Sequence, residues 1–205
     1  MKKMKKIVVL LGILLCGTGV AFAQSGLEVG NGIISASLGV ANAINDVEGH
    51  GWGDHGAFAY GVQGIGIVAP YIGVGLEIAG NNFASVTSKK NSLQTEVNAD
   101  IWNLMLAGRI YLSSMESQTR LYVPVGLGLG FSDIDIKFAG TLYENSSDTS
   151  FVYYAGIGFE DEIGENFLFG FEARYHGGTS AEVELLNDDY SLRYITVAAR
   201  LGYKF

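Results

Sequence analysis

The stretch Tyr190–Phe205, YSLRYITVAARLGYKF, is the part of the sequence that decides the fold. Every second residue of its last eleven is apolar, and the final two of these are Tyr203 and Phe205. The positions between them carry small residues together with Arg200 and Lys204. A period of two is the geometry of a β-strand. One apolar face and one face of small and basic residues are typical of a strand that separates lipid from a polar barrel interior.

Seven earlier segments show the same alternation, and polar or glycine-rich stretches separate them. They cover residues 32–43, 57–68, 71–80, 97–112, 119–131, 150–160 and 166–176. In the second of these segments the apolar parity changes between Val62 and Ile65, from which we predict a β-bulge near Gly64. Together with the last stretch, the segments predict eight strands.

The connections between the eight segments alternate in length. Long polar connections lie near residues 44–56, 81–96, 132–149 and 177–189, and short turns lie between them. Residues 133–137 alternate as well and are a candidate extension of their strand above the membrane. Long outer loops and short periplasmic turns are typical of an antiparallel up-and-down barrel in the outer membrane.

A soluble barrel of the lipocalin type is the alternative. Such a barrel turns its apolar face inward and needs a well charged outer face. Here the second face holds mostly glycine, alanine and tyrosine, and the apolar face carries no charge from the third segment through Ile195. A charge on a lipid-facing position would cost about 2–4 kcal/mol at the bilayer midplane. The expected fold is therefore all-β, an eight-stranded antiparallel up-and-down transmembrane β-barrel.

The first 23 residues predict a cleavable signal peptide, which leaves residues 24–205 as the barrel domain. Four lysines precede the apolar run Ile7–Leu15, and Ala21-Phe22-Ala23 forms an A-x-A cleavage site. This apolar run is shorter than the roughly 20 residues that a transmembrane helix needs. We therefore expect export from the cytoplasm.

Charge and cysteine content exclude some classes of function. The first 23 residues hold four of the 13 basic residues and none of the 21 acidic ones, so the remaining 182 carry nine basic against 21 acidic, a net −12. Such acidity argues against nucleic acid as a partner. No cysteine remains beyond Cys16, so we expect no disulfide to stabilise the exported chain.

The eight alternating segments, the alternating loop lengths and the terminal Phe205 resemble the small eight-stranded bacterial outer-membrane barrels of the OmpA and OmpX type. This resemblance implies a monomer in the bacterial outer membrane, surrounded by outer-membrane lipid. It also implies that Tyr203 and Phe205 form an assembly signal for the barrel assembly machinery.

Charged residues on the second face predict an ion-pair network inside the barrel, because an unpaired buried charge is expensive. The predicted members are Glu77, Arg109, Glu160, Glu172, Arg174, Arg200 and Lys204. Gln63, Asn103, Tyr122 and Tyr154 lie on the same face. The network is either a gate for ions or a structural filling. We favour the filling, since an eight-stranded lumen is just wide enough for its own side chains.

Few other residues suggest chemistry. His50, Trp52 and His55 in the first long loop are candidates for contact with a surface ligand. Histidines among acidic residues can bind a divalent metal, but loop clusters of this kind seldom do, and we expect neither metal nor cofactor. His176, with Ser180 and Glu182, provides the residue types of lipid A deacylases but lacks their His-x-Ser-Asn pattern. We therefore expect no enzyme.

The expected function is that of an integral outer-membrane barrel with a structural or surface-interaction role, in envelope integrity or adhesion, through its outer loops. A narrow porin for ions or small solutes is the first alternative. An outer-membrane lipid-modifying enzyme is the second.

Overall fold

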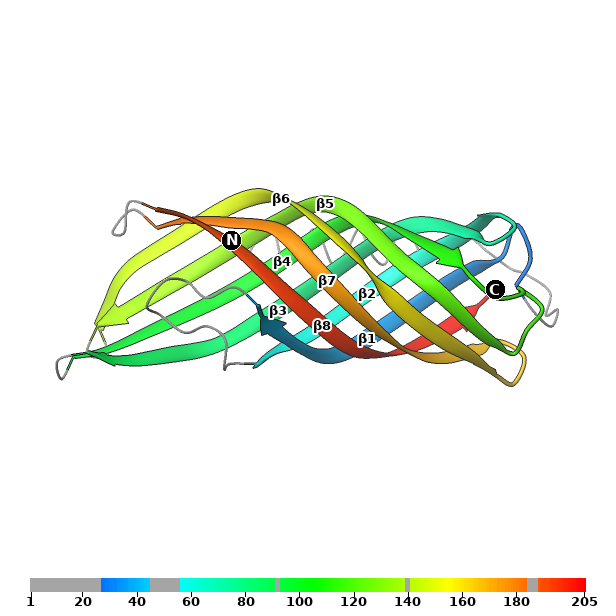
Figure 1. Ribbon diagram of the computed structural model, residues 1–205, viewed down its shortest axis with the longest axis horizontal. Coiled ribbons are helices and arrows are strands. Elements are labelled where there is room, and N and C mark those ends of the chain that lie inside the picture. The colour runs from blue at the N-terminus through cyan, green and yellow to red at the C-terminus, as the bar shows by residue number, and fades with distance from the viewer. Residues whose placement is uncertain (1–26, 45–55, 91–92, 139–140, 184–187) are drawn as a thin grey trace.

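The computed structural model describes residues 27–44, 56–90, 93–138, 141–183 and 188–205. Each segment for which the sequence predicts a strand forms one, and the strands close into a barrel (Figure 1). Their bounds are β1 Gly32–Ala43, β2 Gly56–Ala69, β3 Ile72–Lys90, β4 Leu93–Tyr111, β5 Thr119–Phe138, β6 Thr141–Ile163, β7 Phe167–Val183 and β8 Asp188–Lys204. The predicted eight-stranded antiparallel barrel is confirmed.

The strands follow one another around the barrel in chain order, and β8 closes the ring against β1. The pairing is staggered. A path that starts at Ile33 on β1 and steps around the ring from each residue to its paired neighbour returns to β1 at Ala43, ten residues further on. The path runs through Ile65, Gly75, Ala107, Gly126, Tyr154, His176 and Tyr194. A stagger of this kind tilts the strands by roughly 35–45° to the barrel axis.

The two ends of the barrel differ. The short connections β2–β3, β4–β5 and β6–β7 lie at one end, together with Phe205, and we name it the turn end (Figure 1). The connections β3–β4, β5–β6 and β7–β8 lie at the other, which we name the hairpin end. In outer-membrane barrels the short turns are periplasmic and the longer connections extracellular.

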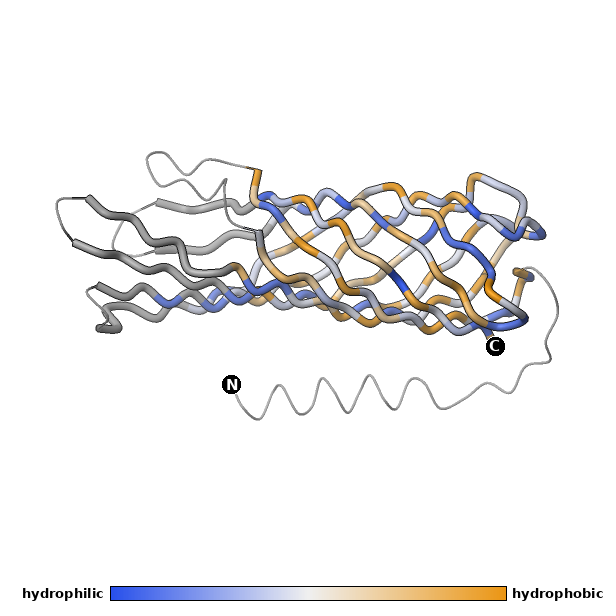
Figure 2. Tube along the Cα trace, turned by 90° about the horizontal axis from the view of Figure 1, so that it is seen from below, coloured by the Kyte–Doolittle hydropathy of each residue, from blue (hydrophilic) through white to orange (hydrophobic). Residues whose placement is uncertain are grey.

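The outward face of the wall is apolar. Leu38 on β1, Leu127 on β5 and Leu201 on β8 are 60%, 51% and 58% exposed. Figure 2 shows hydrophobic residues along the coloured part of the barrel wall, alternating with paler or hydrophilic positions. None of the described residues belongs to a helix long and apolar enough to cross a membrane.

The predicted β-bulge near Gly64 is wrong. β2 alternates without interruption, and its ladder with β1 runs regularly through Gly64. The irregularity in β2 lies between Ile67 and Ala69, next to the turn. The apolar parity changes because Ile65 and Ile67 face the interior, where they are 3% and 2% exposed. An apolar cluster inside the barrel therefore produced the signal that suggested a bulge.

Three of the four predicted outer loops are mostly strand. The ranges 81–96, 132–149 and 177–189 contain the outer ends of β3 to β8, including the extension expected for residues 133–137. The fourth range, 44–56, lies largely outside the described residues. Backbone pairing needs no apolar side chains, so strands continue beyond the point where the apolar alternation ends.

Beyond the closed part of the wall the sheet divides. β6 pairs with β7 only from Tyr153 inward, whereas β6 pairs with β5 out to Thr141 and β7 pairs with β8 out to Val183. A register shift precedes Thr179, and Gly178 beside it has a φ of +86°. Because a bulge bends its strand, β7 turns away from β6 at this point.

Candidate functional site

Charged side chains fill the bore from its middle to the turn end. The seven residues for which the sequence predicts a lumen network all lie there, each at most 7% exposed: Glu77, Arg109, Glu160, Glu172, Arg174, Arg200 and Lys204. Alternation places them, because every second residue of a strand points to the same face. The geometry of their contacts divides them into two groups.

The first group crosses the bore between β3, β7 and β8. Arg174 Nη1 lies 2.5 Å from Glu77 Oε1, and Arg174 also pairs with Glu172. Glu172 Oε1 in turn accepts from Arg200 Nη1 at 2.5 Å and from the hydroxyl of Tyr122 at 2.5 Å. Each carboxylate in this group therefore has a cationic partner.

The second group lies nearer the turn end. Glu160 accepts from Arg109 Nη1 at 2.8 Å and from Arg120 Nε at 3.2 Å. Glu162 accepts from Arg120 Nη1 at 3.1 Å and from Lys204 Nζ at 2.5 Å. Arg120 and Glu162 extend the predicted set. Arg120 lies within the predicted segment 119–131 and shares the inward parity of Tyr122, and Glu162 lies two residues beyond the end of the segment 150–160, so the same alternation predicts both.

Gln63 on β2 joins the two groups. Its Oε1 accepts from Arg109 Nη2 at 2.8 Å and from Arg200 Nη2 at 2.6 Å, and its Nε2 donates to Glu77 Oε2 at 2.7 Å. One hydrogen-bonded network thus connects five cations and four carboxylates of the described bore. Buried ion pairs tolerate loss of one partner poorly, because the other charge then stays buried and uncompensated.

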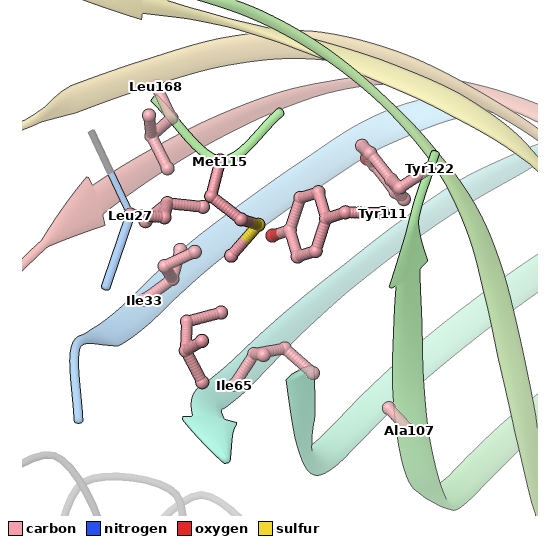
Figure 3. Packing of buried hydrophobic residues seen from close by; sticks show 9 residues of the cluster. Leu27, Ile33, Ile65, Ala107, Tyr111, Met115, Tyr122 and Leu168 are labelled. Carbon is pink, nitrogen blue, oxygen red and sulfur yellow. The ribbon is translucent and has the colours of Figure 1, made fainter. Parts of the chain in front are cut away.

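An apolar cluster closes the bore at the turn end, and we name it the turn-end cluster (Figure 3). Its members are Leu27, Ile33, Ile65, Ile67, Ala107, Tyr111, Met115, Tyr122 and Leu168. Tyr111 links this cluster to the charged network, since its hydroxyl lies 3.3 Å from Glu160 Oε1. Apolar side chains therefore lie between the turn end and the pair Arg109–Glu160, whereas Arg120, Glu162 and Lys204 lie beside the cluster, level with Leu168 and Ile33.

A second apolar cluster lies toward the hairpin end and consists of Ala41, Ala43, Ala57, Ala59, Phe83, Ile101 and Tyr194. The ring of Tyr194 stacks on that of His176, with 4.5 Å between ring centres and 9° between planes. The Tyr194 hydroxyl accepts from Asn81 Nδ2 at 3.2 Å and from Asn103 Nδ2 at 3.1 Å. Tyr194 thus spans the bore on its outer side.

The space left between these layers is small. A void of about 10 Å³ lies between the turn-end cluster and the charged network, next to Ser35, Arg109 and Arg200. That volume is about what one water molecule needs. At this level of the described bore, side chains therefore leave room for little more than one water molecule.

His176 faces the bore. It is 4% exposed, and its Nε2 lies 3.0 Å from Thr196 Oγ1. A residue that acts on membrane lipid must reach the outward face, and His176 points away from it. The described residues also contain no group of three His, Cys, Asp or Glu that could hold a metal ion.

The predicted assembly residues lie at the turn end. Phe205 N donates to Gly32 O at 2.9 Å, and Gly32 N donates to Phe205 O at 2.9 Å, which completes the ladder between the last strand and the first. Tyr203 faces outward and packs edge-on against Phe167, with 5.4 Å between ring centres. The loop candidates His50, Trp52 and His55 lie outside the described residues.

Comparison with solved structures finds small outer-membrane barrels. Neisserial surface protein A has a TM-score of 0.59 at 13% identity, over 87% of this chain and 98% of that one. Outer membrane protein OprG from Pseudomonas aeruginosa has a TM-score of 0.56 at 17% identity, over 88% and 98%. Ail, the attachment invasion locus protein of Yersinia pestis, has a TM-score of 0.53 at 15% identity, over 87% and 100%. At these identities the likeness is one of fold.

Comparison of the sequence gives the family. Among curated proteins no sequence matches, but residues 8–205 match the family model described as the outer membrane protein beta-barrel domain. This family and the solved structures imply a location in the bacterial outer membrane. The chain belongs to the outer membrane protein β-barrel domain family.

Proposed function

We propose that this chain is a surface-interaction protein of the outer membrane, with an adhesion-type role that it performs through its extracellular hairpins and not through its bore. The filled bore supports this function. Three successive layers of side chains, namely the turn-end cluster, the charged network and the Tyr194 cluster, occupy the lumen. Transport through them would require the ion pairs to separate.

The observation that carries the proposal is an unpaired strand edge at the hairpin end. β3 to β6 continue outward as one sheet, in which β6 pairs with β5 as far as Thr141. From Val152 outward, no described strand pairs with the other edge of β6. Every second residue along residues 141–150 therefore presents its N–H and C=O groups to the gap beside β7, which begins beyond the close approach of Gly178 to Phe151 O.

An unpaired edge of this kind recognises an extended peptide, which adds to the sheet as a further strand. The sequence of the edge is polar and acidic. Residues 141–152 contain Glu144 and Asp148 and no lysine or arginine, and residues 178–183 on the facing strand contain Glu182 and no basic residue. The partner that this chemistry fits is an extended, basic segment of a protein outside the cell.

Adhesion of cells that carry the chain tests the proposal. The full chain is expressed in a bacterial host without small barrels of its own, and binding to epithelial monolayers and to an immobilised lysine-rich peptide is counted. The test variant lacks residues 133–138 and 141–147, which removes paired positions of the β5–β6 hairpin and leaves the membrane part of the barrel intact. The control variant lacks residues 87–90 and 93–96 of the β3–β4 hairpin.

We expect the full chain and the control variant to raise adhesion above that of cells with an empty vector, and the β5–β6 variant not to. Equal adhesion by the β5–β6 variant would disprove the role of this edge. If the full chain raises resistance to detergent but not adhesion, the role is structural and the proposal is wrong.

A measurement of ion conductance distinguishes the proposed surface role from the alternative, a narrow porin. Purified chain in planar bilayers should show no open channel that persists, because the described bore is filled. A steady conductance together with uptake of small solutes, in cells that show no adhesion, would favour a narrow porin over the surface role.

A further inference from the structure

A short segment before β1 forms part of the turn-end cluster. Residues 27–31, which we name the strap, cross the mouth of the barrel at this end. Leu27 N donates to Met115 O in the β4–β5 turn at 3.0 Å, Gly30 N donates to Ile67 O at 2.8 Å, and Ile67 N donates to Asn31 O at 2.9 Å. The strap is therefore tied to β2 and to the opposite turn by backbone hydrogen bonds.

Leu27 is the side chain that the strap inserts. It is 3% exposed and lies beside Met115, Leu168 and Ile33 (Figure 3). The residues that follow Leu27 remain outside the mouth, and Val29 is 58% exposed. One apolar side chain thus occupies the mouth, and the rest of the strap lies against the rim.

What the strap covers is the inner part of the charged network, Arg109 and Glu160. Tyr111 lies behind Leu27 and Met115 in the same cluster, and its hydroxyl contacts both Glu160 and Arg109. The void next to Ser35 and Arg109 lies at this boundary. Loss of Leu27 from the mouth would bring periplasmic water to within one layer of Arg109 and Glu160.

The strap is held less firmly than the strands that it joins. A strand of the wall has a ladder on both edges, whereas the strap has the three backbone bonds and Leu27. Its turn is set by Gly30, with a φ of +102°, and by Asn31 Oδ1, which accepts from Glu28 N at 2.7 Å. Segments with few buried contacts open at lower free energy than the core.

We propose that the strap is a detachable seal on the periplasmic mouth, and that its release admits water and small ions to Arg109 and Glu160 while the barrel stays folded. Release alone does not open a channel, because Tyr194 and its cluster still fill the bore on the outer side. The strap is thus the inner of two seals in series. This inference does not depend on the proposed surface function.

Cysteine labelling tests the seal, since residues 24–205 contain no cysteine. Ala107→Cys places a reporter thiol in the turn-end cluster, on β4 and deeper than Tyr111; Ala107 is 1% exposed. The folded chain in detergent micelles is treated with a charged maleimide. The rate of labelling is compared between the strap with Leu27 and the variants Leu27→Asp and Leu27→Gly. Val29→Asp is the matched control, because it adds the same charge at an exposed position of the strap.

We expect both Leu27 variants to raise the labelling rate by roughly tenfold or more, since access to a buried group follows local opening, and Val29→Asp to leave it unchanged. All variants should keep the different gel mobilities of unboiled and boiled samples that mark a folded barrel. Equal protection of the reporter thiol in the Leu27 variants would overturn the proposal. Fast labelling in the presence of Leu27, or an equal increase with Val29→Asp, would overturn it as well.

Discussion

Arg174 on β7 and Glu77 on β3 pair directly across the bore, with 2.5 Å between Nη1 and Oε1. β3 and β7 are four strands apart in a ring of eight, so the two residues stand on opposite walls. Side chains that meet from opposite walls leave no space between them. The same ion pair therefore neutralises two buried charges and closes the lumen at this level.

Loss of Glu77 should destabilise the barrel strongly. Glu77→Ala leaves Arg174 with Glu172 alone and removes the acceptor for Gln63 and Tyr154. Breaking a buried pair costs about 3–5 kcal/mol, so the midpoint of unfolding in guanidinium should fall clearly. Glu116→Ala, at an exposed position of the β4–β5 turn, is the control and should change little. An unchanged midpoint for Glu77→Ala would contradict the pairing.

Arg109 and Glu160 should be coupled energetically. Arg109→Met leaves Glu160 with Arg120, and Glu160→Gln leaves Arg109 with Gln63. Because each single change takes a direct partner from a buried charge that the double change removes, the double variant should lose less stability than the two single variants together. Residues in one network couple by about 0.5–3 kcal/mol. Additive losses in guanidinium unfolding would show that the 2.8 Å contact contributes nothing.

Phe205→Ala should reduce assembly in cells more than folding in detergent. The ring of Phe205 covers Gly32, and the two backbones exchange hydrogen bonds at 2.9 Å. Those backbone bonds survive the change, whereas a side-chain signal read by an assembly machinery does not. The amount of folded barrel in outer-membrane fractions should fall, and refolding from urea into detergent should remain. Phe167→Ala, which removes an outward aromatic ring at the same end, is the control, and an equal loss with it would refute a specific signal.

Gly178→Ala should cost more stability than Gly164→Ala. Both glycines have positive φ, +86° and +71°, and a left-handed conformation costs an alanine about 1–2 kcal/mol. A Cβ at Gly178 would also lie 2.2 Å from Phe151 O, whereas a Cβ at Gly164 would meet nothing within 4 Å. Unfolding midpoints compare the two variants. Equal losses would mean that β7 does not need the close approach to β6 at the point where the strands separate.

The inward positions show how far alternation alone can predict a site. Period two placed Glu77, Glu172 and Arg200 on one face before any pairing was known, since each residue's face follows from its parity. The same rule misassigns Ile65 when every apolar residue is expected to face lipid, because Ile65 is buried inside the barrel. Parity identifies a face, but the choice between lipid and bore requires knowing which side chains the other strands contribute.

The sequence alone does not predict which lumen side chains bind one another, for a related reason. Arg174 and Glu77 are 97 residues apart, and their contact depends on closure of the ring. In the sequence Gln63 is one neutral lumen residue among several. In the structure its amide oxygen accepts hydrogen bonds from Arg109 and Arg200, and its amide nitrogen donates one to Glu77. Only the stagger of eight strands brings these side chains to one level.

The sequence by itself determined the strand count, the closed antiparallel order and the apolar outer face, because these follow from local alternation and from the lengths of the connections. The tertiary structure alone decided which charges pair, where the bore is sealed, and where the sheet divides between β6 and β7. These features arise from contacts between residues far apart in the chain and from a bulge at Gly178 whose effect depends on its neighbour. Local patterns fix the strands, whereas packing across the barrel fixes what the strands enclose.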